Sequence, residues 1–121
     1  MLTVWREPVG HVPYCIGVDT AEGLIHGDYS CAQVLEVRTG EQVAVWHGHI
    51  PPDDFANDIY LLSLWYNDAL TCVESNNHGL TTITQLRHLG APNLFRKRSL
   101  NQATTKVSQE FGWKTTRTTK P

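Results

Sequence analysis

The sequence has few cysteines and no long hydrophobic run. Its three cysteines, Cys15, Cys31 and Cys72, are an odd number, and each lies within an apolar stretch. We therefore expect small core residues in a reducing compartment and no disulfide framework. No apolar run approaches the roughly 20 residues that a membrane-spanning helix needs, and no signal peptide is recognisable at the start. A membrane partner is therefore not expected.

Several catalytic motifs are also missing. The sequence contains no G-x-x-x-x-G-K-[ST], no G-x-S-x-G and no H-E-x-x-H. The first absence argues against a P-loop motor within this chain, and the others against a serine hydrolase elbow and a helical zinc site. What is present is a chain of 121 residues with 40% hydrophobic residues, which predicts one domain with a real core.

The net charge of −2 conceals a strong asymmetry along the chain. Residues 1–86 contain two basic and eleven acidic residues, which leaves −9, whereas residues 87–121 contain eight basic residues and one acid, which leaves +7. An acidic site beside a basic end suits a polyanionic partner such as DNA. The alternative is a solvated basic tail without a partner. The expected DNA-binding residues are Arg96, Lys97, Arg98, Lys106, Lys114 and Arg117.

The first half of the chain predicts an antiparallel meander. Residues 1–11 have no clear period, so they are expected to be a lead-in segment or the remnant of a linker. Residues 12–19, 29–38 and 42–50 have the apolar or alternating character of strands, and turn residues separate them.

The second half predicts alternating helices and strands. Two prolines and two acids from Pro51 open a helix, and residues 69–73 form a short apolar strand. A second helix is expected from about residue 76 to 89, followed by a fifth strand over 93–95. Residues 96–121 are polar, rich in threonine and basic, and suggest a ribbon or hairpin.

This order, β-β-β-α-β-α-β, is that of an α/β fold of the ribonuclease-H-like kind. That fold has a mixed sheet of about five strands, the first three antiparallel, with flanking helices. Its first and fourth strands are neighbours. We therefore expect Asp19 and Glu74, which close the strands at 12–19 and 69–73, to lie side by side.

Asp19 and Glu74 are the main candidates for chemistry. Two neighbouring carboxylates at the ends of buried strands repel each other, and a divalent cation removes that cost. Oxygen ligands suit Mg²⁺ or Mn²⁺, and a pair of such ions supports phosphoryl transfer. The alternatives are structural, because Asp19 could cap the following turn and Glu74 could accept hydrogen bonds from the start of the next helix.

Other polar residues are weaker candidates. Asp28, at the start of the second strand, could approach the metal or cap its loop. His78, close to Glu74, could contact a phosphate or form a bond within its loop. His47 and His49 share a face, which can bind zinc, but no cysteine or acid nearby in the sequence completes a set. They are expected to be surface residues of a strand.

The motifs together resemble the nuclease domain of tailed-phage terminase large subunits. The resemblance covers about residues 12–121 and is carried by Ile16-Gly17-Val18-Asp19-Thr20-Ala21-Glu22-Gly23, Gly27-Asp28-Tyr29-Ser30, Trp46-His47-Gly48-His49-Ile50-Pro51-Pro52-Asp53, Val73-Glu74-Ser75-Asn76-Asn77-His78-Gly79 and Gly112-Trp113-Lys114-Thr115-Thr116 with Thr119-Lys120-Pro121.

The resemblance implies an endonuclease that cuts concatemeric viral DNA during packaging with two Mg²⁺ or Mn²⁺ ions. It implies metal-ligand roles for Asp19 and Glu74. It also implies double-stranded DNA, a packaging ATPase domain, a small terminase subunit and a portal as partners. The setting it implies is the cytoplasm of a bacterial host, for a phage or prophage protein. The family's further aspartate, at the start of a later helix, has no match, so the domain is expected to be incomplete at its C-terminus.

Two rival functions follow from the same residues. Sugar kinases, actin and chaperone ATPases also carry a Gly-x-Asp hairpin, but they need two copies of the fold, and 121 residues hold one. A DNA-binding or assembly module with a decayed nuclease fold is the other rival, and the missing third acid favours it. Metal-dependent DNA cleavage distinguishes this module from a nuclease.

Overall fold

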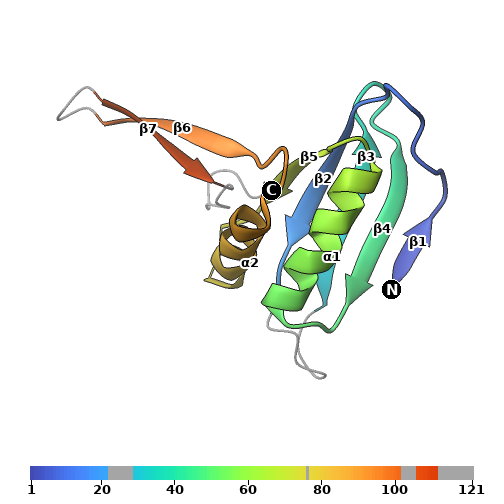
Figure 1. Cartoon of the computed structure of the whole chain (residues 1–121), viewed down its shortest axis with the longest axis horizontal. Coiled ribbons are helices and arrows are strands. Elements are labelled where there is room, and N and C mark those ends of the chain that lie inside the picture. Colours follow the sequence, from blue (N-terminus) through green and yellow to red (C-terminus); the bar gives the residue numbers. More distant parts are fainter. Residues whose placement is uncertain (22–28, 76, 102–105, 112–121) are drawn as a thin grey trace, which may run out of the picture.

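The computed structural model describes residues 1–21, 29–75, 77–101 and 106–111, which form two β-sheets and two helices (Figure 1). In chain order the elements are β1 (Leu2–Val4), β2 (Tyr14–Asp19), β3 (Ser30–Glu36), β4 (Gln42–Gly48), α1 (Pro52–Trp65), β5 (Leu70–Val73), α2 (Asn77–Leu89), β6 (Arg96–Asn101) and β7 (Lys106–Phe111).

The main sheet has five strands in the order β1-β4-β3-β2-β5. β2, β3 and β4 form the predicted antiparallel meander, and β1 pairs antiparallel with the outer edge of β4. β5 pairs parallel with β2 after the chain has crossed the sheet through α1. The predicted adjacency of the strands that end in Asp19 and Glu74 is therefore confirmed.

One face of this sheet is the core. Even-numbered residues of β2, and of β3 up to Val34, point to it and are buried, among them Ile16, because successive strand residues face opposite sides. α1 lies across this face (Figure 1) and packs Phe55 and Ile59 into it, both almost fully buried. Each such side chain contributes about 1.5–3 kcal/mol by leaving water.

The opposite face is open at its centre. Gly17, Asp19 and Gln33 point to this side and are exposed, so no described element covers them. The three cysteines also lie on this face, half-buried. They were expected in the core, and that prediction is wrong. Their places in the alternation of β2, β3 and β5 are those of the open face, which the apolar character of the runs did not reveal.

α2 packs beside α1 through Ile83 and Leu86, which are buried. It ends at Leu89, and the positive φ of 80° at the following Gly90 lets the chain turn back at a low steric cost. There Ala91 donates a backbone hydrogen bond of 3.0 Å to the Leu86 carbonyl. Neither helix in the described part of the chain is long and apolar enough to cross a membrane.

Two differences from the predicted elements concern the sheet edges. Residues 1–11, without a predicted strand, contribute β1, which pairs with β4. The expected fifth strand at 93–95 is reduced to a single parallel bridge between Leu94 and Thr71, with flanking backbone hydrogen bonds of 2.8 Å. The sheet therefore has five strands, but β1 replaces one of those predicted.

β6 and β7 form a separate antiparallel pair with Arg96 opposite Phe111 and Asn101 opposite Lys106. The predicted ribbon is confirmed for the backbone of residues 96–101 and 106–111. Residues 112–121, which include Lys114, Arg117 and Trp113, lie outside the described residues.

Candidate functional site

The structure brings Asp19 and Glu74 together. Val18 of β2 is paired with Val73 of β5, so the next position along each strand places Asp19 beside Glu74. The Glu74 backbone N–H donates a 3.1 Å hydrogen bond to the Val18 carbonyl, which extends the ladder to this point. Adjacent strands are about 4.8 Å apart, so the two carboxylates leave the same face as close neighbours.

The pair lies in a shallow pocket of about 320 Å³ on the open face of the sheet. Gly17 is one of its lining residues, and a Cβ atom at this position would meet nothing within 4 Å, so glycine leaves open space beside the acids. The residues that line the pocket come from β2, β3 and the end of β5, and they are Gly17, Val18, Asp19, Cys31, Gln33, Leu35 and Glu74.

A buried hydroxyl relay holds the end of β2 in place. Thr20, directly after Asp19, donates a hydrogen bond of 3.1 Å from its hydroxyl to the Thr82 hydroxyl of α2. Thr82 in turn donates to the Pro52 carbonyl at the start of α1, at 3.3 Å. Both threonines are almost fully buried. The relay therefore ties the strand that carries Asp19 to both helices.

A second tether acts on the same strand end. The Ala21 backbone N–H donates a hydrogen bond of 2.9 Å to the hydroxyl of Ser30, a buried residue at the start of β3. The chain just beyond Asp19 is thus fixed to the neighbouring strand. Nothing in the sequence pattern marked Thr82 or Ser30 as supports of the site, because a hydroxyl partner across the fold has no local signature.

Cys31 is the thiol nearest to the pair, directly opposite Asp19 across β2 and β3. Burial raises the pKa of the Cys31 thiol; a hydrogen bond with Gln33 acts the other way, and the charge of Asp19 raises the pKa further. The pKa of Cys15 and of Cys72 is also raised by burial. These thiols therefore stay protonated near neutral pH, which is unfavourable for a nucleophile or a soft-metal ligand.

The donor set fits a hard divalent cation better than a soft one. Two carboxylates with access to solvent provide the oxygen ligands that Mg²⁺ and Mn²⁺ prefer. Within the described residues Glu74 forms no ion pair that would compete for such a cation. Among these residues no three His, Cys, Asp or Glu side chains gather closely enough to hold a metal ion, so the pair stands without a third protein ligand there.

The remaining predicted site residues are placed less completely. Asp28 lies outside the described residues, so its part in the site stays a prediction. His78 is the second residue of α2 and half-buried, shortly beyond Glu74. Arg96, Lys97 and Arg98 lie on β6 and Lys106 lies on β7, in the hairpin that follows α2.

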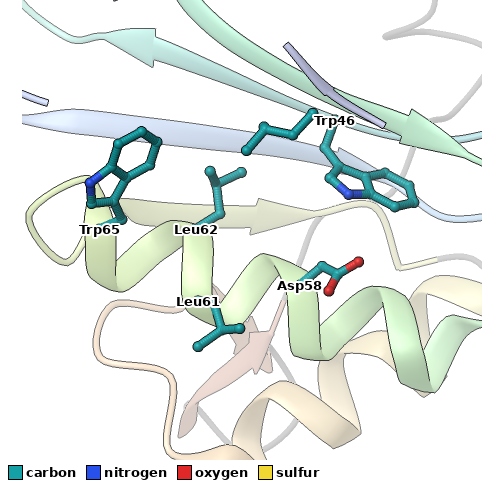
Figure 2. Close-up of a pocket in the computed structure, with 6 residues that line it drawn as sticks. Trp46, Asp58, Leu61, Leu62 and Trp65 are labelled. Carbon is teal, nitrogen blue, oxygen red and sulfur yellow. The ribbon is translucent and has the colours of Figure 1, made fainter. Parts of the chain in front are cut away.

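A second cavity of about 340 Å³ lies on the other side of the sheet, between α1 and the strands β1 and β4. Trp46 and Trp65 stand at its two ends with Leu62 between them, and Asp58 lies near Trp46 (Figure 2). Asp58 is the one acid among the described residues that line it. The pocket at Asp19 and Glu74, which has a carboxylate pair, is therefore the better candidate for metal chemistry.

Comparison with known proteins finds similarity in structure only. No protein-family model and no curated protein matches the chain. The large terminase nuclease of thermophilic phage G20c matches in its magnesium-bound structure with a TM-score of 0.67 at 22% identity, over 76% of this chain and 48% of that one. Its cobalt-bound structure matches with a TM-score of 0.66, over 76% and 47%.

The nuclease domain of the Thermus phage P74-26 large terminase matches with a TM-score of 0.52 at 16% identity, over 89% of this chain and 74% of that one. The chain thus spans about half the length of the G20c nuclease chains. At these identities the likeness establishes the fold. The α/β architecture described here, with its mixed five-stranded sheet and two helices, is the ribonuclease-H-like fold of large terminase nuclease domains.

Proposed function

We propose that this chain is a metal-dependent DNA endonuclease domain of the terminase type. The observation that carries this proposal is the pairing of Asp19 and Glu74 at the ends of two parallel strands, on an open face of the sheet. The fold, shared with nucleases solved with magnesium, cobalt and zinc, supports it. The substrate is double-stranded DNA, and the reaction is hydrolysis of a phosphodiester.

Each residue of the candidate site has a proposed role in this reaction. Asp19, between Glu74 and Cys31 on the open face, would bridge two Mg²⁺ or Mn²⁺ ions, and Glu74 would hold one of them. Such ions lower the pKa of bound water and stabilise the leaving oxygen. The hydrogen bond from Thr20 to Thr82 holds the end of β2, and with it Asp19, in a fixed position. Asp28 is proposed as further support for the site, and His78 as a contact to a phosphate.

The basic segment, residues 87–121, is proposed to bind the DNA backbone. Arg96, Lys97, Arg98 and Lys106, together with Lys114 and Arg117, would neutralise DNA phosphates. The proposed biological setting is viral DNA packaging in the cytoplasm of a bacterial host, for a phage or prophage protein. A packaging ATPase domain, a small terminase subunit and a portal are the proposed partners.

A non-catalytic DNA-binding or assembly module with this fold is the second candidate. It is favoured by the absence of a third acidic ligand among the described residues. Such a module would bind DNA through the basic segment and would not cleave it. Its two adjacent carboxylates would then no longer bind metal ions for catalysis.

A Mn²⁺ titration followed by amide NMR line broadening tests metal binding apart from catalysis. Broadening should centre on residues 17–20 and 73–76 and should be lost in Asp19→Asn and in Glu74→Gln. Asp58→Asn is the matched control, because Asp58 lies in the cavity on the opposite side of the sheet. Broadening that spreads over all surface acids equally would refute a built metal site.

Cleavage is then measured on supercoiled plasmid with Mn²⁺ or Mg²⁺. Nicking that both pair variants abolish and Asp58→Asn retains supports the nuclease. Localised metal binding and DNA binding without any nicking favour the non-catalytic module.

A further inference from the structure

The row that contains the acidic pair continues across the sheet. Asp19 is paired with Cys31 on β3, and Cys31 is paired with His47 on β4. Because directly opposed residues share a face, Glu74, Asp19, Cys31 and His47 lie in one line on the open face. The sequence had placed no cysteine or acid near His47, since these neighbours are distant in the chain.

His47 belongs to an exposed aromatic cluster with Tyr29 and His49. The Tyr29 ring meets the His47 ring edge to face, with centroids 5.6 Å apart, and lies against the His49 ring at 4.0 Å. Tyr29 is 58% exposed and His47 is also exposed, so burial does not explain the cluster. His47, at the end of the row that contains the candidate metal ligands, is thus held by Tyr29 at the surface of the protein.

The backbone beneath this cluster is held in place. β4 at His47 lies between β3 and the start of the chain, whose Met1 carbonyl accepts a 3.0 Å hydrogen bond from the His47 N–H. His49 Nδ1 is buried and has no hydrogen-bond partner in the described part of the chain.

The spacing suits a nucleic acid strand. His47 is two strand spacings from Asp19, about 10 Å. Each strand of a duplex carries a phosphate about every 3.4 Å along the helix axis, so a duplex held at the carboxylates through metal ions has further phosphates within this distance. Imidazole N–H groups donate hydrogen bonds to phosphate oxygens. A metal role is disfavoured, because no three ligating side chains gather among the described residues.

We propose that Tyr29, His47 and His49 form a contact for the DNA backbone, with His47 bound to a phosphate and Tyr29 holding the imidazoles in place. This inference rests on the proposed function, because it takes the substrate to be DNA lying across the open face. It adds to that function a second point of attachment, formed by the end of β4 and the residue before β3, whereas Asp19 and Glu74 close β2 and β5.

Fluorescence anisotropy of a labelled DNA duplex in EDTA, at fixed salt, tests the proposal without cleavage. One lost hydrogen bond is worth about 0.5–1.5 kcal/mol, so His47→Ala should raise Kd by about twofold to tenfold. Tyr29→Ala should do the same, whereas Tyr29→Phe, which keeps the ring, should stay close to wild type. His88→Ala is the matched control, an exposed histidine in the last turn of α2.

The outcomes separate the inference from the proposed function. If wild type binds no DNA in EDTA, the inference is overturned, whereas the metal-dependent nuclease proposal is decided by the plasmid cleavage assay. If wild type binds DNA and His47→Ala and Tyr29→Ala bind equally well, the inference is overturned and the nuclease proposal stands. Circular dichroism verifies the fold of each variant, and His47→Gln, which retains a polar side chain, replaces His47→Ala if the alanine variant does not fold.

Discussion

At the scale of single residues, the adjacent carboxylates of Asp19 and Glu74 are an electrostatic cost to the fold when no cation is present. Like charges directly opposite on neighbouring strands destabilise a sheet by about 0.2–1 kcal/mol. Glu74→Gln keeps the size and the backbone hydrogen bond to Val18. We therefore expect this variant to raise the free energy of unfolding by that amount in EDTA, as measured by urea denaturation.

The stability gained by Glu74→Gln should be smaller at high salt, because screening weakens the repulsion between Asp19 and Glu74 in the wild type. It should also reverse when Mn²⁺ is added, since only wild type then binds the ion and is stabilised by it. A Glu74→Gln variant that is less stable than wild type in EDTA would instead assign Glu74 a structural role.

Tyr66 sets an alkaline limit to stability. It is fully buried, and its hydroxyl donates a 2.7 Å hydrogen bond to the Arg6 carbonyl. Burial, followed by the charges of Tyr14 and Glu7, raises the pKa of Tyr66 to about 12, whereas an unfolded tyrosine titrates near 10. The unfolded state therefore loses this proton first, and stability present below pH 10 should be lost as the pH rises toward 12.

The measurement is the free energy of unfolding as a function of pH between 8 and about 12. In Tyr66→Phe the free energy of unfolding should fall less steeply above pH 10 than in the wild type. The substitution should also lower stability at pH 8 by about 1–3 kcal/mol, because the Arg6 carbonyl loses its partner. An identical alkaline slope in the variant would show that another group causes it.

At the scale of elements, the relay between β2, α2 and α1 predicts the effect of a distant substitution on the site. Thr82→Val keeps the shape and removes the hydroxyl, which leaves Thr20 and the Pro52 carbonyl without their bonds. We expect a loss of about 1–3 kcal/mol in the free energy of unfolding and weaker Mn²⁺ broadening at Asp19. Thr84→Val is the control, because Thr84 is exposed and its hydroxyl donates a hydrogen bond to the Leu80 carbonyl of its own helix.

A Thr82→Val protein that loses stability but broadens normally with Mn²⁺ would show that the relay supports the fold and not the position of Asp19. The two readouts therefore distinguish a positioning residue from a merely structural one.

The elements also show what the sequence could reveal. The strands of the meander and both helices have local signals, such as alternation in β3 and the prolines at the start of α1. The predicted bounds of these strands and of α2, and the predicted start of α1, lie within two residues of those observed. The adjacency of Asp19 and Glu74 follows from the order of these elements. β1 has no such signal, because Leu2–Val4 is short and becomes a strand only through its pairing with β4.

The residues that surround Asp19 in the folded protein could not be predicted either, because they too have no local sequence signal. Thr82 meets Thr20, and His47 lines up with Asp19, only through the register of the folded sheet and the packing of α2. A one-residue shift in register would have placed His47 on the core face.

At the scale of the whole molecule, the separation of acidic and basic residues predicts a steep salt dependence of DNA binding. Each phosphate contact adds about 0.9 to the slope of log K against log salt. Replacing Arg96, Lys97 and Arg98 with glutamine should reduce the slope by about that amount for each side chain that contacts DNA. Arg38→Gln, in the acidic part of the chain, should leave it unchanged. Equal slopes for all three proteins would refute the basic segment as the DNA grip.

The parallel pairing of β2 with β5 also affects how the protein forms. The hairpins β2–β3 and β3–β4 join neighbouring segments, whereas β5 reaches β2 only after α1 has crossed the sheet. Contacts between distant segments close slowly, because the loop entropy must be lost before they form. Asp19 and Glu74 would then meet late in folding, against their own repulsion. A newly made or partly folded chain would therefore carry both carboxylates without presenting them as a pair.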